Sequence, residues 1–392
     1  MNILLTGGRA PVTLDLARAF HRAGHTVFMA ESLRGHLSQP SNAIKANFVV
    51  PAPRQEGEAF LAALKKIIEE NQVELLIPTC EEVFHIAKGL DKLPCRVFTE
   101  PLGKLDGYHN KWKFVVKAGD CDLRVPESML ITRQDDLLYA YAHWRGVVLK
   151  PVYSRFASRT LILMPLKEAL STLTFDRQQP WIAQEYIEGQ QFCSYSVCQN
   201  GRITAHAVYP SIFTAGQGAT ISFQPVEHAA IYEWVWRFVE RYNVTGQMAF
   251  DFVQTADGHV AALECNPRAT SGVHLLTDNP QFVESFFDVS TTLRQAQDGS
   301  SAQMDCVTPY AHTSRMLGTA MLVYGMPAAI RNGSFGAWLK TFLHSDDVLL
   351  DFHDPLPFLF QFRSLFNYMS LGRRQKISAL EASTFDIEWN GE

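Results

Sequence analysis

The chain has 392 residues, more than one hydrophobic core usually organises, so two or three domains are expected. Hydrophobic residues make up 47% of the chain and charged residues 19%, as in ordinary globular proteins. The formal net charge of −5 gives no overall attraction to nucleic acid or to an anionic membrane. No apolar run approaches the roughly 20 residues of a membrane span. We therefore expect neither nucleic acid nor membrane as a partner.

The first residues and the cysteines indicate a compartment. The opening residues 1–8 lack the basic region of a secretory signal and are too short for one, so they read as a first strand. The seven cysteines are odd in number and include no C-x-x-C pair, which favours reduced thiols over a disulfide framework. Both features predict a cytoplasmic protein.

Residues 1–105 alternate between strand and helix patterns. Residues 2–5 are apolar, and the helical pattern that follows is closed by Gly24 before a second strand at 26–30. This β-α-β order predicts a doubly wound parallel sheet. The turn after the first strand does not match G-x-G-x-x-G, so a nicotinamide cofactor has little support.

The same domain continues with a helix over about 58–71 and a strand at 73–77. Thr79 and Glu82 follow with the spacing of a capping box, which makes a structural role the first expectation for Glu82.

The most informative stretch is 246–276. Its dipeptide Asp257-Gly258 suits a two-residue hairpin turn. Such a turn pairs Ala256 with His259, Val253 with Ala262, and Asp251 with Glu264. Side chains opposite each other in this way have Cβ atoms roughly 5 Å apart.

Facing carboxylates repel each other, so the pairing of Asp251 with Glu264 makes sense when a divalent cation lies between them. Strand periodicity puts the amide of Asn266 on the same face as Glu264. Carboxylate and amide oxygens suit Mg²⁺, which keeps ligand positions for water and phosphate. The alternative is an ordinary hairpin with solvated acidic residues, because alternation does not say which face is wet.

The run Glu264-Cys265-Asn266-Pro267-Arg268 resembles the E-x-N-P-R signature of ATP-grasp enzymes. The resemblance implies that Asp251, Glu264 and Asn266 ligate Mg²⁺, with Mn²⁺ as an alternative. It also implies that Arg268 contacts the phosphates or the reacting carboxylate, which makes it the expected catalytic residue. Cys265 should point away from this face and pack.

Two lysines resemble the family's phosphate-binding lysines. Lys150 stands near the end of the apolar strand 147–151, where the family's lysine contacts the α- and β-phosphates. Lys111 follows Asn110 at the start of a helical segment, similar to the family's Asp-Lys motif with Asn in place of Asp. From the residues alone, both lysines read as solvated surface charges.

Residues 181–189 resemble the hinge between the two ATP-grasp lobes, although they also read as an edge strand entering a turn. The resemblance places Glu185 near the adenine amine and the main chain of Tyr186 and Ile187 against the adenine ring. Gln191 stands where many members carry a ribose-binding Glu.

Two further segments bear on this region. The loop 153–159 has no glycine, unlike the family's phosphate-covering loop. A second hairpin is predicted after the strand 192–198, with its turn at Asn200-Gly201.

The resemblance covers roughly residues 100–290. It implies a small lobe at 106–184 and a large lobe with the metal site at 185–305. The polar run 294–305 reads as a surface loop, and the aromatic-rich segment 306–392 is expected to pack on the ATP-grasp body.

The resemblance implies an ATP-dependent ligase that joins a carboxylate to an amine through an acyl phosphate and releases ADP and phosphate. ATP and Mg²⁺ are the implied cofactors, small-molecule carboxylates and amines are the implied partners, and a homodimer is compatible with this reading. The first domain of such ligases often lines the acceptor site, which would bring Glu81 or Glu82 to the amine. Two alternatives stay open: a bicarbonate-activating enzyme of the carbamoyl-phosphate synthase or biotin carboxylase kind, and a regulatory ATP-binding protein without chemistry.

Overall fold

The fold is described from a computed structural model, which covers residues 1–392 apart from 154–159, 176–179, 217, 288–305 and 392. The loop expected at 294–305 and most of the loop 153–159 therefore lie outside the described residues.

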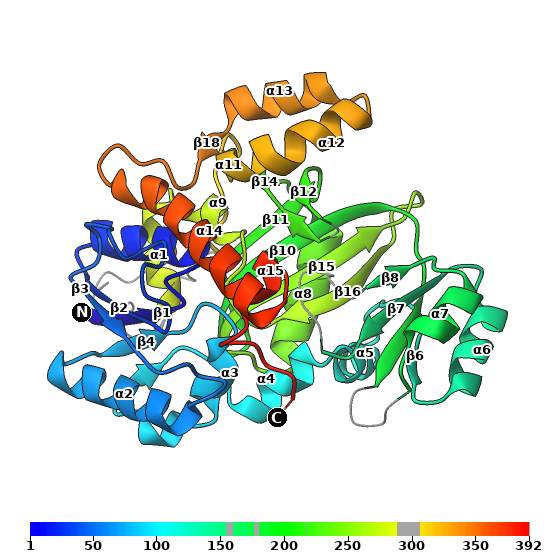
Figure 1. Cartoon of the computed structure of the whole chain (residues 1–392), viewed down its shortest axis with the longest axis horizontal. Helices are drawn as coiled ribbons and strands as arrows, with labels where there is room; N and C mark the ends of the chain where they lie inside the picture. Colours follow the sequence, from blue (N-terminus) through cyan, green and yellow to red (C-terminus); the bar gives the residue numbers. More distant parts are fainter. Residues whose placement is uncertain (154–159, 176–179, 217, 288–305, 392) are drawn as a thin grey trace, which may run out of the picture.

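A five-stranded parallel sheet forms the N-terminal domain (Figure 1). Its strand order is β3-β2-β1-β4-β5, so the chain starts at the centre and winds outward in both directions, as predicted. Gly24 follows the last turn of the first helix with φ +82°, the left-handed conformation that glycine adopts without strain. The elements are β1 (Asn2–Thr6), α1 (Pro11–Arg22), β2 (Thr26–Glu31), β3 (Ala46–Val49), α2 (Gly57–Glu70), β4 (Leu75–Ile77), α3 (Glu82–Ala87), the 3₁₀ turn η1 (Leu90–Lys92), β5 (Arg96–Val97) and α4 (Leu102–His109).

The small lobe is an antiparallel sheet of order β6-β9-β7-β8, with two helices packed on it. A separate helix, α5, leads into this lobe, and its first turn is capped by the side chain of Asn110, which accepts a hydrogen bond from Lys113 N at 3.0 Å. The elements are α5 (Lys111–Gly119), β6 (Ser128–Ile131), α6 (Gln134–His143), β7 (Val147–Pro151), β8 (Leu161–Ile162), α7 (Leu166–Thr172) and β9 (Trp181–Glu185).

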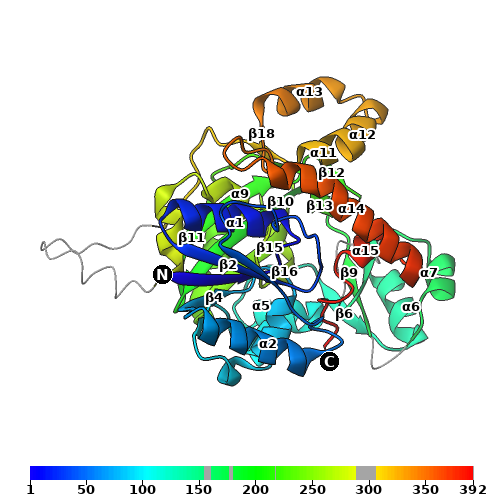
Figure 2. The same ribbon diagram turned by 60° about the vertical axis from the view of Figure 1, so that its left-hand side comes forward.

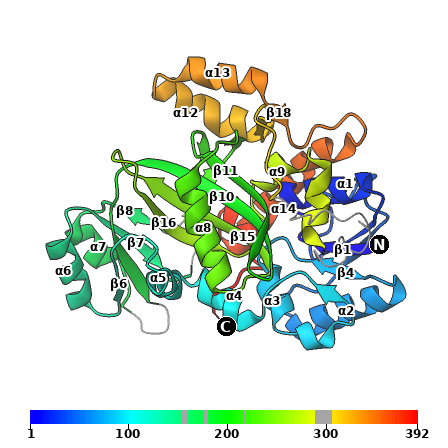
Figure 3. The ribbon, with the colours of Figure 1, turned by 180° about the vertical axis from the view of Figure 1, so that it is seen from behind.

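The large lobe is built on an antiparallel sheet of order β11-β10-β15-β16. Helix α8 covers one face through Trp234 and Phe238, as Figure 3 shows from behind. The other face shares a core with α1 and β1 of the N-terminal domain. The elements are β10 (Gln190–Gln199), β11 (Arg202–Pro210), β12 (Thr214–Ala215), β13 (Ala219–Thr220), β14 (Ser222–Phe223), α8 (Ala229–Arg241), β15 (Gly246–Gln254), β16 (Val260–Asn266), α9 (Val273–Leu276) and η2 (Pro280–Phe286).

The hairpin between β10 and β11 turns at Asn200-Gly201, as predicted. Both residues have positive φ values, +49° and +77°, as a two-residue turn of this kind requires.

The β15–β16 hairpin differs from its prediction in the turn. The loop has three residues, closed by Thr255 N donating to His259 O, and Gly258 adopts φ +87°. Ala256 therefore does not pair with His259, and Val253 pairs with Ala261 instead of Ala262.

An irregularity between Asp251 and Phe252 then restores the predicted register. The partner strand contains one extra residue there, Leu263, so Asp251 still faces Glu264. The longer turn and the extra residue Leu263 each shift the register by one, and the two shifts cancel at Asp251 and Glu264.

The C-terminal segment contacts the large lobe and the N-terminal domain. Strand β17 pairs with β14 of the large lobe, and α14 packs through Ser364 against the loop at Gly35 of the N-terminal domain (Figure 2). The sequence-based expectation named only the ATP-grasp body. The elements are β17 (Arg315–Met316), α11 (Gly318–Ala320), the π-helical turn η3 (Met321–Gly325), α12 (Met326–Arg331), α13 (Phe335–His344), β18 (Asp346–Asp347), α14 (Leu356–Gln375) and α15 (Ala379–Ala382).

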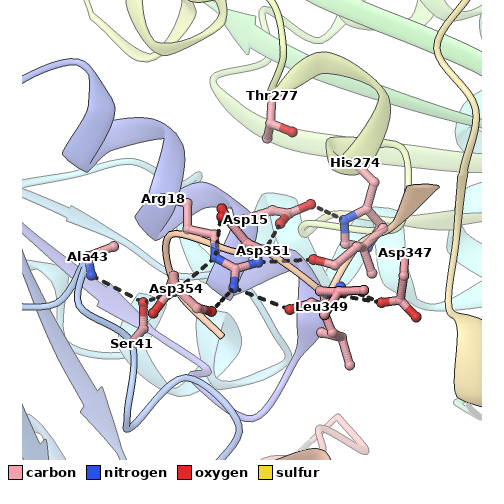
Figure 4. Close-up of polar contacts among 12 residues, drawn as sticks. Asp15, Arg18, Ser41, Ala43, His274, Thr277, Asp347, Leu349, Asp351 and Asp354 are labelled. Carbon is pink, nitrogen blue, oxygen red and sulfur yellow. Dashed lines mark hydrogen bonds and ion pairs between the residues drawn. The ribbon is translucent and has the colours of Figure 1, made fainter. Parts of the chain in front are cut away.

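Arg18 holds this segment to the first helix (Figure 4). Its Nε donates to Asp354 Oδ2 at 2.9 Å, and its other nitrogens donate to the carbonyls of Val348 and Leu349. Arg18 and Asp354 are both buried, so they form a desolvated ion pair between two domains.

Next to this pair, His274 Nδ1 lies 2.6 Å from Asp15 Oδ2. In the sheet of the large lobe, His206 Nδ1 lies 2.9 Å from Ser196 Oγ. Both histidines are buried in structural contacts. Among the helices that the structure describes, none is long and apolar enough to cross a membrane.

Substituting Arg18→Met should lower the free energy of unfolding by about 3–5 kcal/mol, because it leaves Asp354 buried without its cation. Denaturant-induced unfolding followed by fluorescence measures this. Lys66→Met, at an exposed position of α2, is the control and should change stability by less than about 0.5 kcal/mol. An equal, small effect of both substitutions would show that the Arg18 contacts do not hold the segment.

Candidate functional site

Two carboxylates face each other across the β15–β16 hairpin. Asp251 and Glu264 are paired in the ladder, and Asn266 Nδ2 lies 3.5 Å from Asp251 Oδ2. The structure thus brings together the three predicted oxygen ligands. Cys265, between two of them, points the other way and is buried beside Phe250, as expected.

Two buried lysines balance these charges. Lys111, on the first turn of α5, has its Nζ 3.3 Å from Glu264 Oε2, and its backbone N–H donates to Val152 O just beyond β7. Lys150, on β7, is buried with them. The sequence alone favoured solvated surface lysines, but both side chains are almost fully shielded.

The two carboxyl groups respond oppositely to this environment. Burial, and then the charge of Glu264, raises the pKa of Asp251 to about 7. Burial also acts to raise the pKa of Glu264, but the charges of Lys111 and Lys150 outweigh it and hold that pKa well below its usual range. Burial lowers the pKa of Lys150.

Arg268 lies at the junction with the N-terminal domain. Its Nη2 is 3.4 Å from Glu81 Oε1, and Glu81 Oε2 accepts a hydrogen bond from the backbone N–H of Trp389 at 3.1 Å. The C-terminal tail is thereby linked to the predicted catalytic arginine through one carboxylate.

The sequence left open whether Glu81 or Glu82 reaches the site, and the structure separates them. Glu82 Oε1 accepts from Thr6 Oγ1 at 2.7 Å and from the backbone N–H groups of Thr79 and Cys80. Glu82 is therefore held in structural contacts, although α3 begins at Glu82 and has no side-chain cap, so the predicted capping box is not formed. Glu81 faces Arg268.

Sequence reasoning missed His109, the residue that ends α4. Its ring lies 4.7 Å from the ring of Phe84, and neither ring nitrogen has a hydrogen-bond partner among the described residues. Burial, followed by the charges of Arg268 and Lys111, lowers its pKa well below the usual value. Its place just before Asn110-Lys111 was the available signal.

Cys193 was also missed. It pairs with Asp251 in the ladder between β10 and β15, where burial and the nearby carboxylate raise the pKa of its thiol well above the usual value.

The hinge residues occupy the end of β9. Glu185 Oε1 accepts from Glu127 N at 3.1 Å, and Tyr186 N donates to Gly146 O at 2.9 Å. Gln191 is the second residue of β10, and its side chain is exposed. Whether Glu185, Tyr186, Ile187 and Gln191 contact a nucleotide stays a prediction.

The residues present fit a magnesium–nucleotide complex. Within the described part of the chain no three or more His, Cys, Asp or Glu side chains form a metal cluster, and the donor set is two carboxylates and an amide. Mg²⁺ takes its remaining ligands from water and phosphate, so this small set suits it. Arg268 Nη1 is buried without a hydrogen-bond partner among the described residues, as expected of a donor awaiting an anion.

The comparisons with known proteins identify the domain that carries these residues. Residues 108–272 match the family model of the ATP-grasp domain. The chain therefore contains an ATP-grasp domain. A comparison with curated proteins finds no significant match.

Solved structures share the fold well beyond this domain. An ADP complex of N5-carboxyaminoimidazole ribonucleotide synthetase is similar with a TM-score of 0.59 and 14% identity, over 72% of this chain and 75% of that one. The L-amino acid ligase of Bacillus licheniformis has a TM-score of 0.56 and 16% identity, over 72% and 73%.

A third structure is the biotin carboxylase domain dimer of 2-oxoglutarate carboxylase from Hydrogenobacter thermophilus, in complex with MgADP, ADP and bicarbonate. Its TM-score is 0.57 with 12% identity, over 72% of this chain and 69% of that one. At such identities the likeness concerns the fold alone.

Asp251→Asn should stabilise the metal-free protein at pH 8 by about 1 kcal/mol or more. The folded-state pKa of Asp251, about 7, lies above its unfolded value, so its stabilising protonation is present at low pH and is lost as the pH rises through 7. The gain should shrink toward pH 5, and denaturant unfolding with a chelator present measures it.

Asp257→Asn, at the exposed turn of the same hairpin, is the matched control and should bring no gain at pH 8, because its carboxylate has a lowered pKa. If Asp251→Asn changes stability equally at pH 5 and pH 8, the two carboxylates do not repel each other.

Lys150→Ala should weaken ATP binding about ten- to a hundredfold, since a lost charge-assisted contact is worth about 1.5–3 kcal/mol. Adenosine, which lacks phosphates, should lose much less affinity in calorimetric titration. Lys167→Ala, at an exposed position of α7, should leave both affinities unchanged. Equal weakening for both ligands would remove Lys150 from the phosphates.

Proposed function

We propose that the protein is an ATP-dependent ligase that joins a carboxylate to an amine through an acyl phosphate. The observation that carries this proposal is the partly buried pair Asp251 and Glu264, facing each other beside the buried Lys111 and Lys150. A hairpin with only a structural role has no need of two opposed carboxylates, because like charges directly opposite each other destabilise a ladder.

The acidic and amide side chains and the basic side chains have different proposed roles. Asp251, Glu264 and Asn266 would hold Mg²⁺, which when bound offsets the negative charge of the phosphates. Lys111, Lys150 and Arg268 would stabilise the charge that develops during phosphoryl transfer. The burial of the two lysines increases the effect, because charges interact more strongly where water is excluded.

Among the described residues, neither cysteine beside the site is a reactive nucleophile. Burial raises the pKa of Cys193 and of Cys265 well above the usual thiol value, so neither is a thiolate near neutral pH. This supports transfer to the substrate itself. A substrate carboxylate oxygen attacks the γ-phosphorus and ADP leaves; the amine nitrogen then attacks the carbonyl carbon, inorganic phosphate leaves, and the amine loses a proton.

Glu81 is the residue proposed to meet the amine. It is a buried carboxylate whose present partner, Arg268, is expected to turn toward the substrate carboxylate or the phosphates. Glu82 is excluded from this role by its bonds to Thr6, Thr79 and Cys80.

Activation of bicarbonate is the second candidate. It is supported by the similar fold of the biotin carboxylase domain that was crystallised with MgADP and bicarbonate.

All seven cysteines are free, in keeping with the proposed cytoplasmic location.

Incubation with ATP, Mg²⁺, hydroxylamine and pools of carboxylates should form ADP, phosphate and a hydroxamate of the true substrate. Hydroxylamine replaces the amine and traps the acyl phosphate. ADP formation that depends on bicarbonate alone would favour the second candidate. AMP as the main product would contradict the acyl phosphate, and ADP formation without any carboxylate dependence would favour a regulatory protein.

Arg268→Ala should lower the turnover rate in this assay more than it lowers the affinity for nucleotide, because its charge is needed most in the transition state. Arg133→Ala, at an exposed position of the small lobe, is the control. A variant that loses only nucleotide affinity would assign Arg268 to ground-state binding.

A further inference from the structure

Exposed apolar side chains gather in one part of the chain. More than half of the large apolar residues that are exposed among the described residues lie between Tyr310 and Met369. Monomeric soluble proteins rarely expose so much apolar surface in one region without a binding role.

Helix α14 carries one part of this surface. Its inner side is made by Pro357, Ser364 and Gly372, which are buried. Its outer side is formed by side chains spaced as neighbours on one helical face, with exposed fractions between 42% and 69%: Leu359, Phe362, Phe366 and Met369.

Helix α13 carries the other part. With α12 it forms an arm that projects from the body in all three views (Figures 1, 2 and 3). Trp338 faces inward, while Phe335, Leu339 and Leu343 repeat every four residues on the exposed side. We call the exposed apolar face of α14 the apolar–basic surface, for the charge described next; the exposed face of α13 belongs to the separate arm.

The charge of these helices is one-sided. Residues 317–345 and 355–378 contain six Lys or Arg side chains and no Asp or Glu, although the whole chain has more acidic than basic residues. All six cations are exposed, and none forms an ion pair with a described Asp or Glu. They are Arg331, Lys340, Arg363, Arg373, Arg374 and Lys376.

Four acidic residues lie between the two helices, and one of them anchors the segment to the body. Asp354 is buried and accepts from Arg18 and Ser41 of the N-terminal domain (Figure 4). Asp347 accepts from the backbone of Gly318 and Leu349 within the segment, while Asp346 is exposed and pairs with Arg315. The helices themselves carry apolar and cationic side chains and no acidic ones.

We propose that the apolar–basic surface docks on an anionic lipid membrane. Large apolar side chains next to basic ones, with no acidic groups, are the composition of helices that lie in the membrane interface. A second copy of the chain is a poorer occupant, because a symmetric interface brings the same patch together and leaves its cations without counter-charges. The net charge of −5 conceals this local excess.

Sedimentation with lipid vesicles tests the proposal on the full chain. The protein should bind vesicles of phosphatidylcholine mixed with phosphatidylserine, bind pure phosphatidylcholine vesicles more weakly, and lose the difference at high salt. The double substitution Phe362→Gln with Phe366→Gln should weaken binding at least about tenfold. Arg373→Gln with Arg374→Gln should weaken binding only to the anionic vesicles.

Tyr139→Gln, which removes an exposed aromatic side chain from α6 of the small lobe, is the matched control and should bind as the parent does. Unchanged melting temperatures show that the variants are folded. Failure of the parent to bind anionic vesicles, or binding that the Phe362 and Phe366 substitutions leave unchanged, would overturn the proposal. A stable dimer that those substitutions dissociate, without vesicle binding, would overturn it in favour of a second copy.

Discussion

The site depends on two carboxylates held opposite each other in a place with little water. Asp251 and Glu264 are fixed by the ladder of β15 and β16, so neither can move away from the other without breaking the hairpin. The protein answers this repulsion with the ammonium group of Lys111, 3.3 Å from Glu264, and with Lys150. One result is that Asp251 retains a proton near neutral pH, which a bound cation would displace.

The charged residues that meet at this site come from different parts of the chain. Lys111 comes from the helix that follows the N-terminal domain, Lys150 from the small lobe, and the carboxylates from the large lobe. Three parts of the chain must meet for the charges to balance. The C-terminal tail is a fourth part, because Glu81 contacts both Arg268 and the backbone of Trp389 in that tail.

Much of this arrangement could be predicted from the sequence, because local patterns carry it. The β-α-β start and the turn at Asn200-Gly201 follow from apolar periodicity and turn residues. The facing of Asp251 with Glu264 was predicted correctly because two errors of one residue, in the turn and at Leu263, cancel. The detail of the β15–β16 turn was wrong, since Asp257-Gly258 suits both two- and three-residue loops, and nothing in the sequence marks the extra residue Leu263.

Contacts between distant segments could not be predicted. No spacing rule relates Glu81 to Trp389, or His109 to Phe84, because each pair is brought together only by the packing of whole domains. The choice between Glu81 and Glu82 likewise needed the structure. Burial of Lys111 and Lys150 is a further example, since a single lysine at an element's end usually faces water.

The C-terminal segment shows how an overall charge can mislead. Its buried Asp354 binds Arg18 of the body, while the six basic residues of 317–345 and 355–378 are exposed, so a small net charge hides a local excess of cations. The proposed membrane contact rests on this local excess and is independent of the chemistry at Asp251 and Glu264.

The central claim is that the facing carboxylates are a cation site for nucleotide phosphates. Crystals grown with Mn²⁺ and a non-hydrolysable ATP analogue test it directly, because Mn²⁺ gives an anomalous signal. The account predicts an anomalous peak in contact with Asp251, Glu264 and the phosphates, with Lys111 and Lys150 turned toward the nucleotide. A nucleotide bound elsewhere, or bound here with no metal between the two carboxylates, would contradict it.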